Sequence, residues 1–417
     1  MDFALNEEQR HWQMKARKFA EEEIRPISLA RDAIEDPSET FTWDIIKKGS
    51  KLGFRTMAVP KEYGGHGTDY VSQALVMAEL ARGDSAISKT FSQCWKWSHL
   101  IAAVCSDEQK DRFLKPFIED DTYVLGKGGT EPTAGSDNRL PPPDDPKAGH
   151  KLRAERHGDE WILNGEKTFI ANGSIAKLFF LDVRTNPNVS VKEGSTLFMV
   201  TRDTPGFRHG KVFNKRGWRF YQNAELIFEN ARVPHANVVG EVNGGGKKPG
   251  AAGDTSGGDI FGDLELAANA LGVCESACEL AMQHARTHKQ GGRPLVEQQL
   301  VLLKLNRMYM LTEALRSFVL RVAWEHDMKI HSANAGLAMN FSEEAIQTVT
   351  ELGLEIFGAA GGVTSPEAEK LVRDSLIWTH LAGDNVQRMR VAQRLVRMAE
   401  AIERKARETI PELTAAE

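Results

Sequence analysis

The residues best suited to ligand chemistry form one short stretch, 130–137, which reads TEPTAGSD. Thr130 and Ser136 offer hydroxyl groups, and Gly135 would let backbone N–H groups approach a phosphate closely. These features are typical of a turn that binds an anion or a planar ring. An ordinary polar turn is the alternative, because glycine and serine are common in turns of every kind.

The elements around this stretch change from a helical to a β pattern. Upstream, Trp12, Ala16 and Phe19 recur at the spacing of one helix face. From residue 124 to residue 239, short apolar runs alternate with turn residues, and Asn164-Gly165 between two such runs is a strong hairpin signal. The stretch therefore lies where a helical region gives way to an antiparallel β domain.

The rest of the chain returns to helical periodicity after a glycine-rich segment. Residues 243–261 hold many glycines without periodicity, which predicts a linker. Apolar residues then recur at helical spacing almost to the end. The predicted organisation is an all-α domain at 1–123, a β domain at 124–242, the linker at 243–261 and a helical domain at 262–417.

The composition excludes several classes of protein. The 53 Lys and Arg residues and 58 Asp and Glu residues give a net charge of −5, which offers no electrostatic basis for binding nucleic acid. With 27% charged residues and no apolar run of about 18 residues, a membrane-spanning chain is not expected. The N-terminus lacks a signal-peptide pattern, so we expect a soluble cytoplasmic protein. The four cysteines lack the spacing of a zinc site, so we expect no metal.

The stretch 130–137 resembles the fingerprint of the acyl-CoA dehydrogenase family, Thr-Glu-Pro-x-Ala-Gly-Ser-Asp, at every position. Further segments resemble the family in the same order along the chain, at 161–173, 294–299, 356–361 and 370–374. The resemblance covers essentially the whole chain. It implies an α+β multidomain fold with an N-terminal helical domain, a middle antiparallel β-barrel-like domain and a C-terminal four-helix bundle.

The resemblance also implies that FAD is the cofactor, held between the subunits of a homo-oligomer, a tetramer or a dimer. One group of residues would contact the flavin and its ribityl–phosphate arm, and a second group would reach the adenine and pyrophosphate end of a partner's FAD. The first group is Thr130, Gly135, Ser136, Phe169, Ile170, Ala171 and Asp384, and the second is His288, Gln299, Glu355, Ile356, Phe357, Gly358 and Ala359.

Several of these positions depart from the family's pattern. Phe169 stands where the family has a Trp that stacks on the ring, and Ala171 replaces a hydroxyl residue beside flavin N5. His288 replaces the Arg that meets the pyrophosphate, and Gly291 replaces a Phe. Arg293 lies close in the sequence and is a hypothetical substitute for the lost positive charge.

The family's catalytic Glu is missing from both of its usual places. The common place is Ala382, and the alternative place, at the start of the first C-terminal helix, is Gly262. Abstraction of the α-proton still requires a base, and a buried carboxylate of raised pKa suits that role. The candidates are Asp384 and Asp263, whose structural alternatives are a helix cap and a first-turn charge, with His380 as a further candidate.

The pocket for the acyl group in this family is lined by the helix at 89–99, and the side chains of that helix here are polar and bulky. Lys89 would pair with a carboxylate at the far end of an acyl group, unless it points to solvent. Trp95 and Trp97 fit a ring-bearing substrate or simple core packing. Lys89 and Ser136 are therefore the candidate substrate-binding residues.

The sequence thus predicts an FAD-dependent oxidoreductase of the acyl-CoA dehydrogenase type. Its predicted reaction is the α,β-dehydrogenation of an unusual acyl-CoA thioester, cyclic or carboxylate-bearing, with electrons passed to an electron-transfer flavoprotein. A flavin-dependent monooxygenase or oxidase on the same fold is one alternative, which the missing Glu, Ala171 and His380 would fit. A non-catalytic flavoprotein subunit is the other, which His288 and Gly291 would fit.

Overall fold

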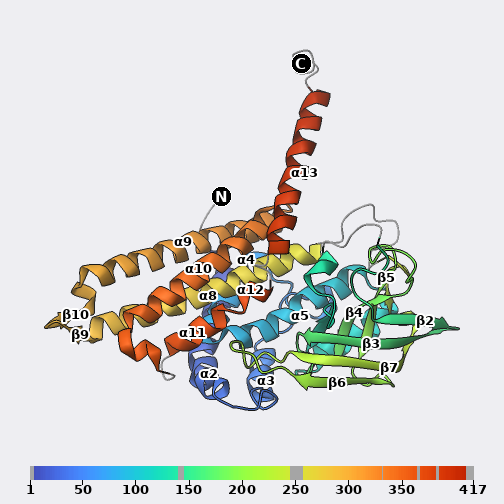
Figure 1. Ribbon diagram of the computed structural model, residues 1–417, viewed down its shortest axis with the longest axis horizontal. Coiled ribbons are helices and arrows are strands. Elements are labelled where there is room, and N and C mark those ends of the chain that lie inside the picture. The colour runs from blue at the N-terminus through green and yellow to red at the C-terminus, as the bar shows by residue number, and fades with distance from the viewer. Residues whose placement is uncertain are drawn as a thin grey trace.

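The computed structural model describes residues 4–139, 145–244, 257–330, 332–363, 367–381 and 385–409. A helical domain, a β domain and a second helical domain follow one another along the chain, which confirms the predicted fold class. Figure 1 shows the helices of the two helical domains packed together, with the sheet at one end of them. None of the described helices is long and apolar enough to cross a membrane.

The N-terminal domain is built from helices whose starts are fixed by polar side chains. Asn6 accepts a hydrogen bond from Gln9 N (2.8 Å) at the start of the first helix, and Asp69 accepts one from Ser72 N (2.7 Å) at the start of the fourth. The helices are α1 Glu7–Phe19, a π-helical turn Ala20–Ile24, α2 Arg25–Asp32, α3 Trp43–Lys51, α4 Tyr70–Gly83, α5 Ser85–Val104, α6 Asp107–Gln109, a second π-helical turn Lys110–Leu114 and α7 Lys115–Glu119.

The middle domain is one eight-stranded sheet with the order β6-β7-β3-β2-β4-β5-β8, in which β1 pairs with β4. Most neighbouring strands are antiparallel as predicted, but β1 and β2 each run parallel to β4. The strands are β1 Leu125–Gly128, β2 Arg153–His157, β3 Glu160–Ile170, β4 Leu178–Arg184, β5 Ser195–Thr201, β6 Phe207–Val212, β7 Ala224–Pro234 and β8 Val238–Val239.

Asn164-Gly165 is not a hairpin turn, so that prediction is wrong. Both residues lie inside the long strand β3, where the register with β7 shifts between Leu163 and Gly165. Gly165 has a φ of +133°, which side chains disfavour, and a Cβ there would lie 3.1 Å from Leu152 Cα. The pair therefore forms a β-bulge, and the chain reverses earlier, at Gly158 (φ +62°).

The C-terminal domain is dominated by three long helices, α8, α9 and α10, which contact one another. Helix α4 of the N-terminal domain packs along α8 and α9, whereas α13 projects from the body, so the predicted four-helix bundle is not completed by α13 (Figure 1). Helix α8 begins inside the predicted linker, whose residues 245–256 lie outside the described ranges. The elements are α8 Gly257–Thr287, β9 Lys289–Gln290, β10 Arg293–Pro294, α9 Gln299–Asp327, α10 Asn334–Ile356, α11 Glu367–Ser375, α12 Trp378–Leu381 and α13 Asn385–Thr409.

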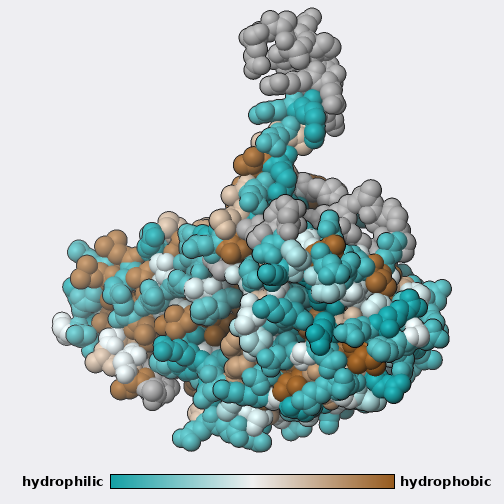
Figure 2. All heavy atoms as spheres, turned by 45° about the vertical axis from the view of Figure 1, so that its right-hand side comes forward, coloured by the Kyte–Doolittle hydropathy of each residue, from teal (hydrophilic) through white to brown (hydrophobic). Residues whose placement is uncertain are grey.

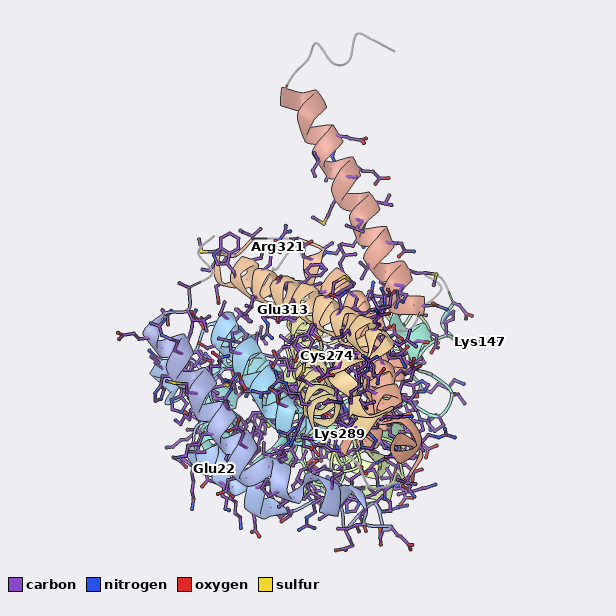
Figure 3. The ribbon with its side chains drawn as sticks, turned by 90° about the vertical axis from the view of Figure 1, so that its left-hand side faces the viewer. Glu22, Lys147, Cys274, Lys289, Glu313 and Arg321 are labelled. Carbon is purple, nitrogen blue, oxygen red and sulfur yellow. The ribbon has the colours of Figure 1, made fainter. Side chains whose placement is uncertain are left out.

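The interior of the helical packing is largely apolar, and the charged side chains buried within it include ion-paired ones. Cys274 of α8 lies inside it, whereas Glu313 and Arg321 lie on α9 towards the outside (Figure 3). Burial raises the pKa of Cys94 to about 11 and that of Cys278 to about 11. These thiols therefore stay protonated and pack as small apolar groups.

A buried charge cluster joins all three domains. Lys370 Nζ of α11 lies 3.0 Å from Asp84 Oδ2 and 2.7 Å from Asp374 Oδ2. The Asp374 carboxylate also accepts hydrogen bonds from Trp218 N of the middle domain (2.7 Å) and from Ser85 Oγ of α5 (3.0 Å). Because the three charged groups are buried, each of them depends on the others for compensation.

The same cluster fixes the start of α5. Asp84 Oδ1 accepts hydrogen bonds from Ala86 N (2.8 Å) and Ile87 N (3.0 Å), so Asp84 is the N-cap of that helix. Gly217 allows the middle domain to approach α11, because a Cβ there would lie 2.3 Å from the Arg373 carbonyl oxygen. The start of α5, the segment before β7 and α11 are therefore held in one fixed arrangement.

Replacing Asp374 by Ala should lower the free energy of unfolding by about 3–5 kcal/mol, because Lys370 is left buried with one fewer counter-charge. Urea unfolding followed by circular dichroism measures this difference. Glu229→Ala is the control, since Glu229 pairs with Arg208 (3.3 Å) at the surface and its loss should change less than about 1 kcal/mol. Equal losses in the two variants would contradict the role of the cluster.

Candidate active site

The TEPTAGSD stretch forms a tight turn beyond the end of β1. Glu131 N donates to Ala134 O (2.7 Å), and Ala134 N donates back to Glu131 O (3.2 Å). Gly135 N donates to Asp137 Oδ1 (2.6 Å). The sequence suggested that backbone N–H groups here would be open to a phosphate, whereas this N–H is used within the turn. A Cβ at Gly135 would meet nothing closer than Thr130 Cγ2 at 3.9 Å, so the chain leaves room on that side.

The end of this turn lies against the last helix. Ser136 is exposed and begins the helical turn Ser136–Arg139, which contacts α13. Asp384 directly precedes α13 in the sequence but lies outside the described residues, as does Ala382. The contact nevertheless brings the turn and the start of α13 together from distant parts of the sequence.

Glu131 anchors the turn to the sheet, a role that the sequence analysis did not assign. Its carboxylate accepts hydrogen bonds from Lys167 Nζ (2.8 Å), Lys151 N (2.5 Å) and Leu152 N (2.9 Å). Glu131 and Lys167 are both buried, and burial lowers the pKa of Lys167 although Glu131 opposes that effect. A buried carboxylate with three donors holds the turn rigidly in place.

Phe169 provides an exposed aromatic surface beside this turn. Its side chain is 57% exposed, its backbone has a φ of +57°, and its ring stacks on Phe213 with centroids 4.1 Å apart. Thr168 N donates to Thr130 O (2.9 Å), which places Phe169 next to the turn. A large aromatic ring exposed from a strained backbone offers a flat apolar surface on which a ligand ring could stack.

The second group of expected FAD residues contains an aromatic stack. The Phe357 ring lies on His284 (centroids 4.2 Å apart), which lies in turn on His288 (4.9 Å). Burial and the neighbouring His288 lower the pKa of His284, so this imidazole is held neutral. Gly358 follows with a φ of +59° and no atom within 4 Å of a built Cβ, so the backbone there is open to a flat ligand.

The remaining members of the second group differ in the exposure and pairing of their side chains. Gln299 and Ala359 are exposed, and Glu355 Oε2 pairs with Lys304 Nζ (2.7 Å). Ile356 is buried, as is Ile170 of the first group, so both would reach FAD only through their backbones. Arg293 donates to Gln298 Oε1 (3.3 Å) beside this group.

The structure does not bring the two groups together within one chain. The described members of the first group follow β1 or lie at the end of β3 in the sheet, whereas His288 directly precedes β9, at the end of the helical domains farthest from the sheet (Figure 1). The two groups therefore lie at opposite ends of the chain's fold in Figure 1. This separation is consistent with a cofactor-binding site to which a second copy of the chain contributes residues.

Of the two candidate bases, Asp263 falls within the described residues. Its carboxylate accepts from Gln387 Nε2 (3.2 and 3.1 Å), which ties α8 to the first turn of α13, directly after residues 382–384. Gly262 instead faces α5, because a Cβ there would lie 3.5 Å from Lys96 Nζ. His380 is exposed.

Lys89 neither faces solvent nor is a free cation. Its Nζ lies 2.5 Å from Glu265 Oε1, both side chains are buried, and Ser92 Oγ donates to the same carboxylate oxygen. Glu265 was not among the predicted site residues, although its spacing from Gly262 carries a signal. Glu265 follows Gly262 by three positions in a helical region and so shares its helix face.

The tryptophans of α5 pack within the protein. Trp95 Nε1 donates to Phe54 O (2.6 Å) in the N-terminal core. The Trp97 ring stacks on Phe180 of β4 with centroids 4.9 Å apart, so it fills the contact between α5 and the sheet. Core packing therefore accounts for both residues.

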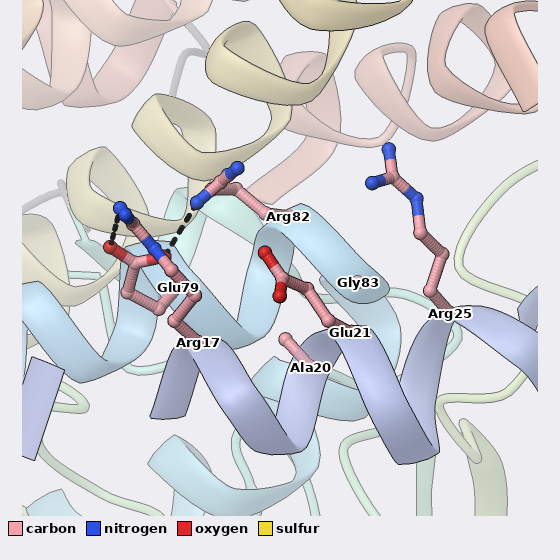
Figure 4. A pocket seen from close by; sticks show the side chains of 7 residues that line it. All are labelled: Arg17, Ala20, Glu21, Arg25, Glu79, Arg82 and Gly83. Carbon is pink, nitrogen blue, oxygen red and sulfur yellow. Dashed lines mark hydrogen bonds and ion pairs between the residues drawn. The ribbon is translucent and has the colours of Figure 1, made fainter. Parts of the chain in front are cut away.

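A small hollow between α1 and α4 carries three arginines whose charges are already paired (Figure 4). Arg17 and Arg82 point towards Glu79 at 2.6 and 2.8 Å, and Arg25 pairs with Glu367 of α11 at 3.1 Å. The Arg25–Glu367 pair joins the two helical domains, and the Glu79 pairs join α1 to α4. The hollow is therefore a structural contact and offers no unpaired cation for a ligand.

Three family models match successive parts of the chain. The acyl-CoA dehydrogenase N-terminal domain matches residues 6–121, the middle domain matches 126–231, and the C-terminal domain matches 262–396. These boundaries follow the helical, β and helical domains of the structure.

Individual relatives agree over nearly the full length. The probable acyl-CoA dehydrogenase YngJ of Bacillus subtilis is 30% identical over 402 residues, 95% of this chain and 100% of the relative. A 3-(aryl)acrylate reductase of Clostridium sporogenes is 32% identical over 389 residues, 92% of this chain and 97% of the relative. The structure of butyryl-CoA dehydrogenase from Megasphaera elsdenii superposes with a TM-score of 0.86 at 29% identity, covering 95% of this chain and 100% of the other.

Replacing Glu131 by Gln should weaken the hold on FAD about tenfold or more, because the turn loses the charged acceptor of Lys167 and two backbone N–H groups. Retention of FAD during gel filtration, followed by flavin absorbance, measures the effect. The matched control is Glu160→Gln, whose partner Arg232 lies 2.6 Å away at the surface of the same sheet. Full FAD retention by the Glu131 variant would show that the anchor is dispensable.

Proposed function

Because the chain belongs to the acyl-CoA dehydrogenase family, we propose that it catalyses the α,β-dehydrogenation of an acyl-CoA thioester. It is an FAD-dependent flavoprotein oxidoreductase of that family. The observation that carries the proposal is the joined surface of the TEPTAGSD turn and the exposed ring of Phe169. FAD bound there would accept the hydride that leaves the β-carbon, while a residue of this chain removes the α-proton.

The proposed base is Asp384 or Asp263. Asp384 immediately precedes α13, and the bond from Gln387 brings Asp263 to the first turn of the same helix. Asp263 therefore lies where α8 meets the first turn of α13, and Asp384 directly precedes that turn in the sequence. The α13 contact with the helical turn Ser136–Arg139 supports this place for the chemistry.

The proposed binding place of the acyl group is along α5 and α8. Ser136 and Lys89 are the proposed substrate contacts. The sequence-based proposal is a cyclic or carboxylate-bearing acyl group. The neutralisation of Lys89 by Glu265 weakens support for the carboxylate, and the packing of Trp95 and Trp97 weakens support for the ring. An electron-transfer flavoprotein is the proposed acceptor of the electrons.

A homo-oligomer, tetramer or dimer, is proposed as the working form. Helix α9 exposes Leu300 (74%), Leu303 (66%) and Met310 (51%) on one side, and Figure 2 shows apolar side chains gathered at that end of the molecule. A patch of this kind is typical of a subunit interface. Burial of α9 against a second copy would also bring Gln299 towards that copy's FAD.

Anaerobic addition of acyl-CoA thioesters to the yellow holoenzyme should bleach the flavin absorbance, because two electrons pass to FAD. Asp384→Asn or Asp263→Asn should slow this bleaching by about 10²–10⁴-fold, the usual contribution of a general base. Stopped-flow absorbance measures both effects. Normal rates in both variants would exclude both proposed bases.

The same experiment separates the alternatives. Bleaching only after addition of NAD(P)H or a reduced flavin donor would favour a monooxygenase. Rapid reoxidation by oxygen alone would favour an oxidase over transfer to an electron-transfer flavoprotein. Failure of every thioester to bleach or bind would contradict the proposed function.

Replacing Leu300 and Leu303 by Glu should convert the oligomer to a monomer and release FAD, because the proposed interface would bury two charges. Sedimentation velocity and flavin absorbance measure the two effects together. Met14→Glu on α1, where the native side chain is 63% exposed, is the control and should leave both unchanged. An intact oligomer in the double variant would show that α9 is not the interface.

A further inference from the structure

We infer that Glu265, with Lys89 and Ser92, forms the inner end of the acyl site and selects an acyl group whose far end carries an uncharged hydrogen-bonding group such as a hydroxyl. The inference rests on the proposed function, which places the acyl group between α5 and α8. Glu265 would then determine substrate specificity. The far end of the preferred acyl group would be a neutral polar group instead of the carboxylate proposed from the sequence.

The buried Lys89–Glu265 pair leaves hydrogen-bonding capacity unused within the described residues. Lys89 is 7% exposed and Glu265 is 4% exposed, yet both protein partners of Glu265 bond to Oε1. Oε2 accepts no hydrogen bond from any residue that the structure describes. Lys89 uses one of its three N–H donors on Glu265. Glu265 Oε2 can therefore accept a hydrogen bond from a ligand, and Lys89 Nζ can donate two more.

The position of the pair along the two helices also supports the inference. Gly262 lies opposite Lys96, Glu265 lies opposite Ser92, and Asn269 Nδ2 donates to Ser85 O (3.0 Å). The helices α5 and α8 therefore run antiparallel in this contact, and Glu265 lies about 4.5 Å deeper than Gly262 along α8. An acyl group that reacts beside Gly262 would place its far end at the pair.

Two uncharged polar side chains, Tyr221 and Gln93, lie near the pair. Tyr221 Oη donates to Gln93 Oε1 (3.3 Å), and both residues are buried. Burial, with a contribution from Glu265, raises the pKa of Tyr221 well above its ordinary value, so the phenol stays protonated. The pair therefore lies among uncharged hydrogen-bonding groups.

The charges of the pair decide which acyl ends it accepts. A carboxylate would approach Glu265 as well as Lys89, and an ammonium would meet Lys89, so either charge is opposed. An alkyl end would leave Oε2 unpaired. A hydroxyl satisfies both partners, because it donates to Glu265 Oε2 and accepts from Lys89 Nζ.

The experiment compares alkyl, ω-hydroxy and ω-carboxy acyl-CoA thioesters in a butanoyl and a hexanoyl series. The native holoenzyme should prefer the ω-hydroxy member by about tenfold or more in kcat/KM and in Kd measured by tryptophan fluorescence. Glu265→Gln should reverse the order of the hydroxy and carboxy members, because Lys89 is then free to pair with the carboxylate. A native preference for the alkyl member, or an unchanged order in Glu265→Gln, would overturn the inference.

Two variants control for a general loss of structure. Lys89→Met with Glu265→Leu removes both charges at similar volume, should remain folded and should prefer the alkyl member. Glu79→Gln alters a different buried carboxylate, paired with Arg17 and Arg82, and should lower stability without changing the order. Bleaching by thioesters with no change of order in Glu265→Gln and in the Lys89→Met, Glu265→Leu double variant would overturn the inference alone, whereas absence of both binding and bleaching would overturn the proposed function with it.

Discussion

The interaction between Lys370 and the two carboxylates of Asp84 and Asp374 sets the relative positions of the three domains. Asp84 is the N-cap of α5, and Asp374 accepts a hydrogen bond from Trp218 N in the segment before β7. The cluster therefore contacts two of the elements that form the site. Because the charges are buried, none can move without leaving another uncompensated. The geometry between α5, α8 and the sheet therefore depends on residues that touch neither flavin nor substrate.

The sequence allowed the three-domain fold and the TEPTAGSD turn to be predicted, because both depend on local patterns. Asn164-Gly165 shows where a local pattern fails, since pairing of β3 with β7 on one side and β2 on the other converts a turn signal into a bulge. The parallel pairing of β1 with β4 depends on contacts between distant residues and carries no local signal.

The site was predictable only in part, for a similar reason. Phe169 was identified by its place in a motif, but its exposure follows from a backbone strain that only the folded chain reveals. Lys89 was identified as a cation without its partner, because Glu265 lies on a helix more than a hundred residues away in the sequence. A charge read from sequence alone therefore says little about the charge that a ligand meets.

The projecting helix α13 has a consequence for how this protein responds to dilution. Its exposed apolar residues include Met389 (50%), Val396 (57%) and Ile402 (68%), while its first turns are tied to α10 through Arg388 and Glu343 (2.7 Å). If a second copy covers that helix, mass action links the melting temperature to protein concentration. Thermal stability would then be a property of the assembly and would rise with each increase in the amount of chain present.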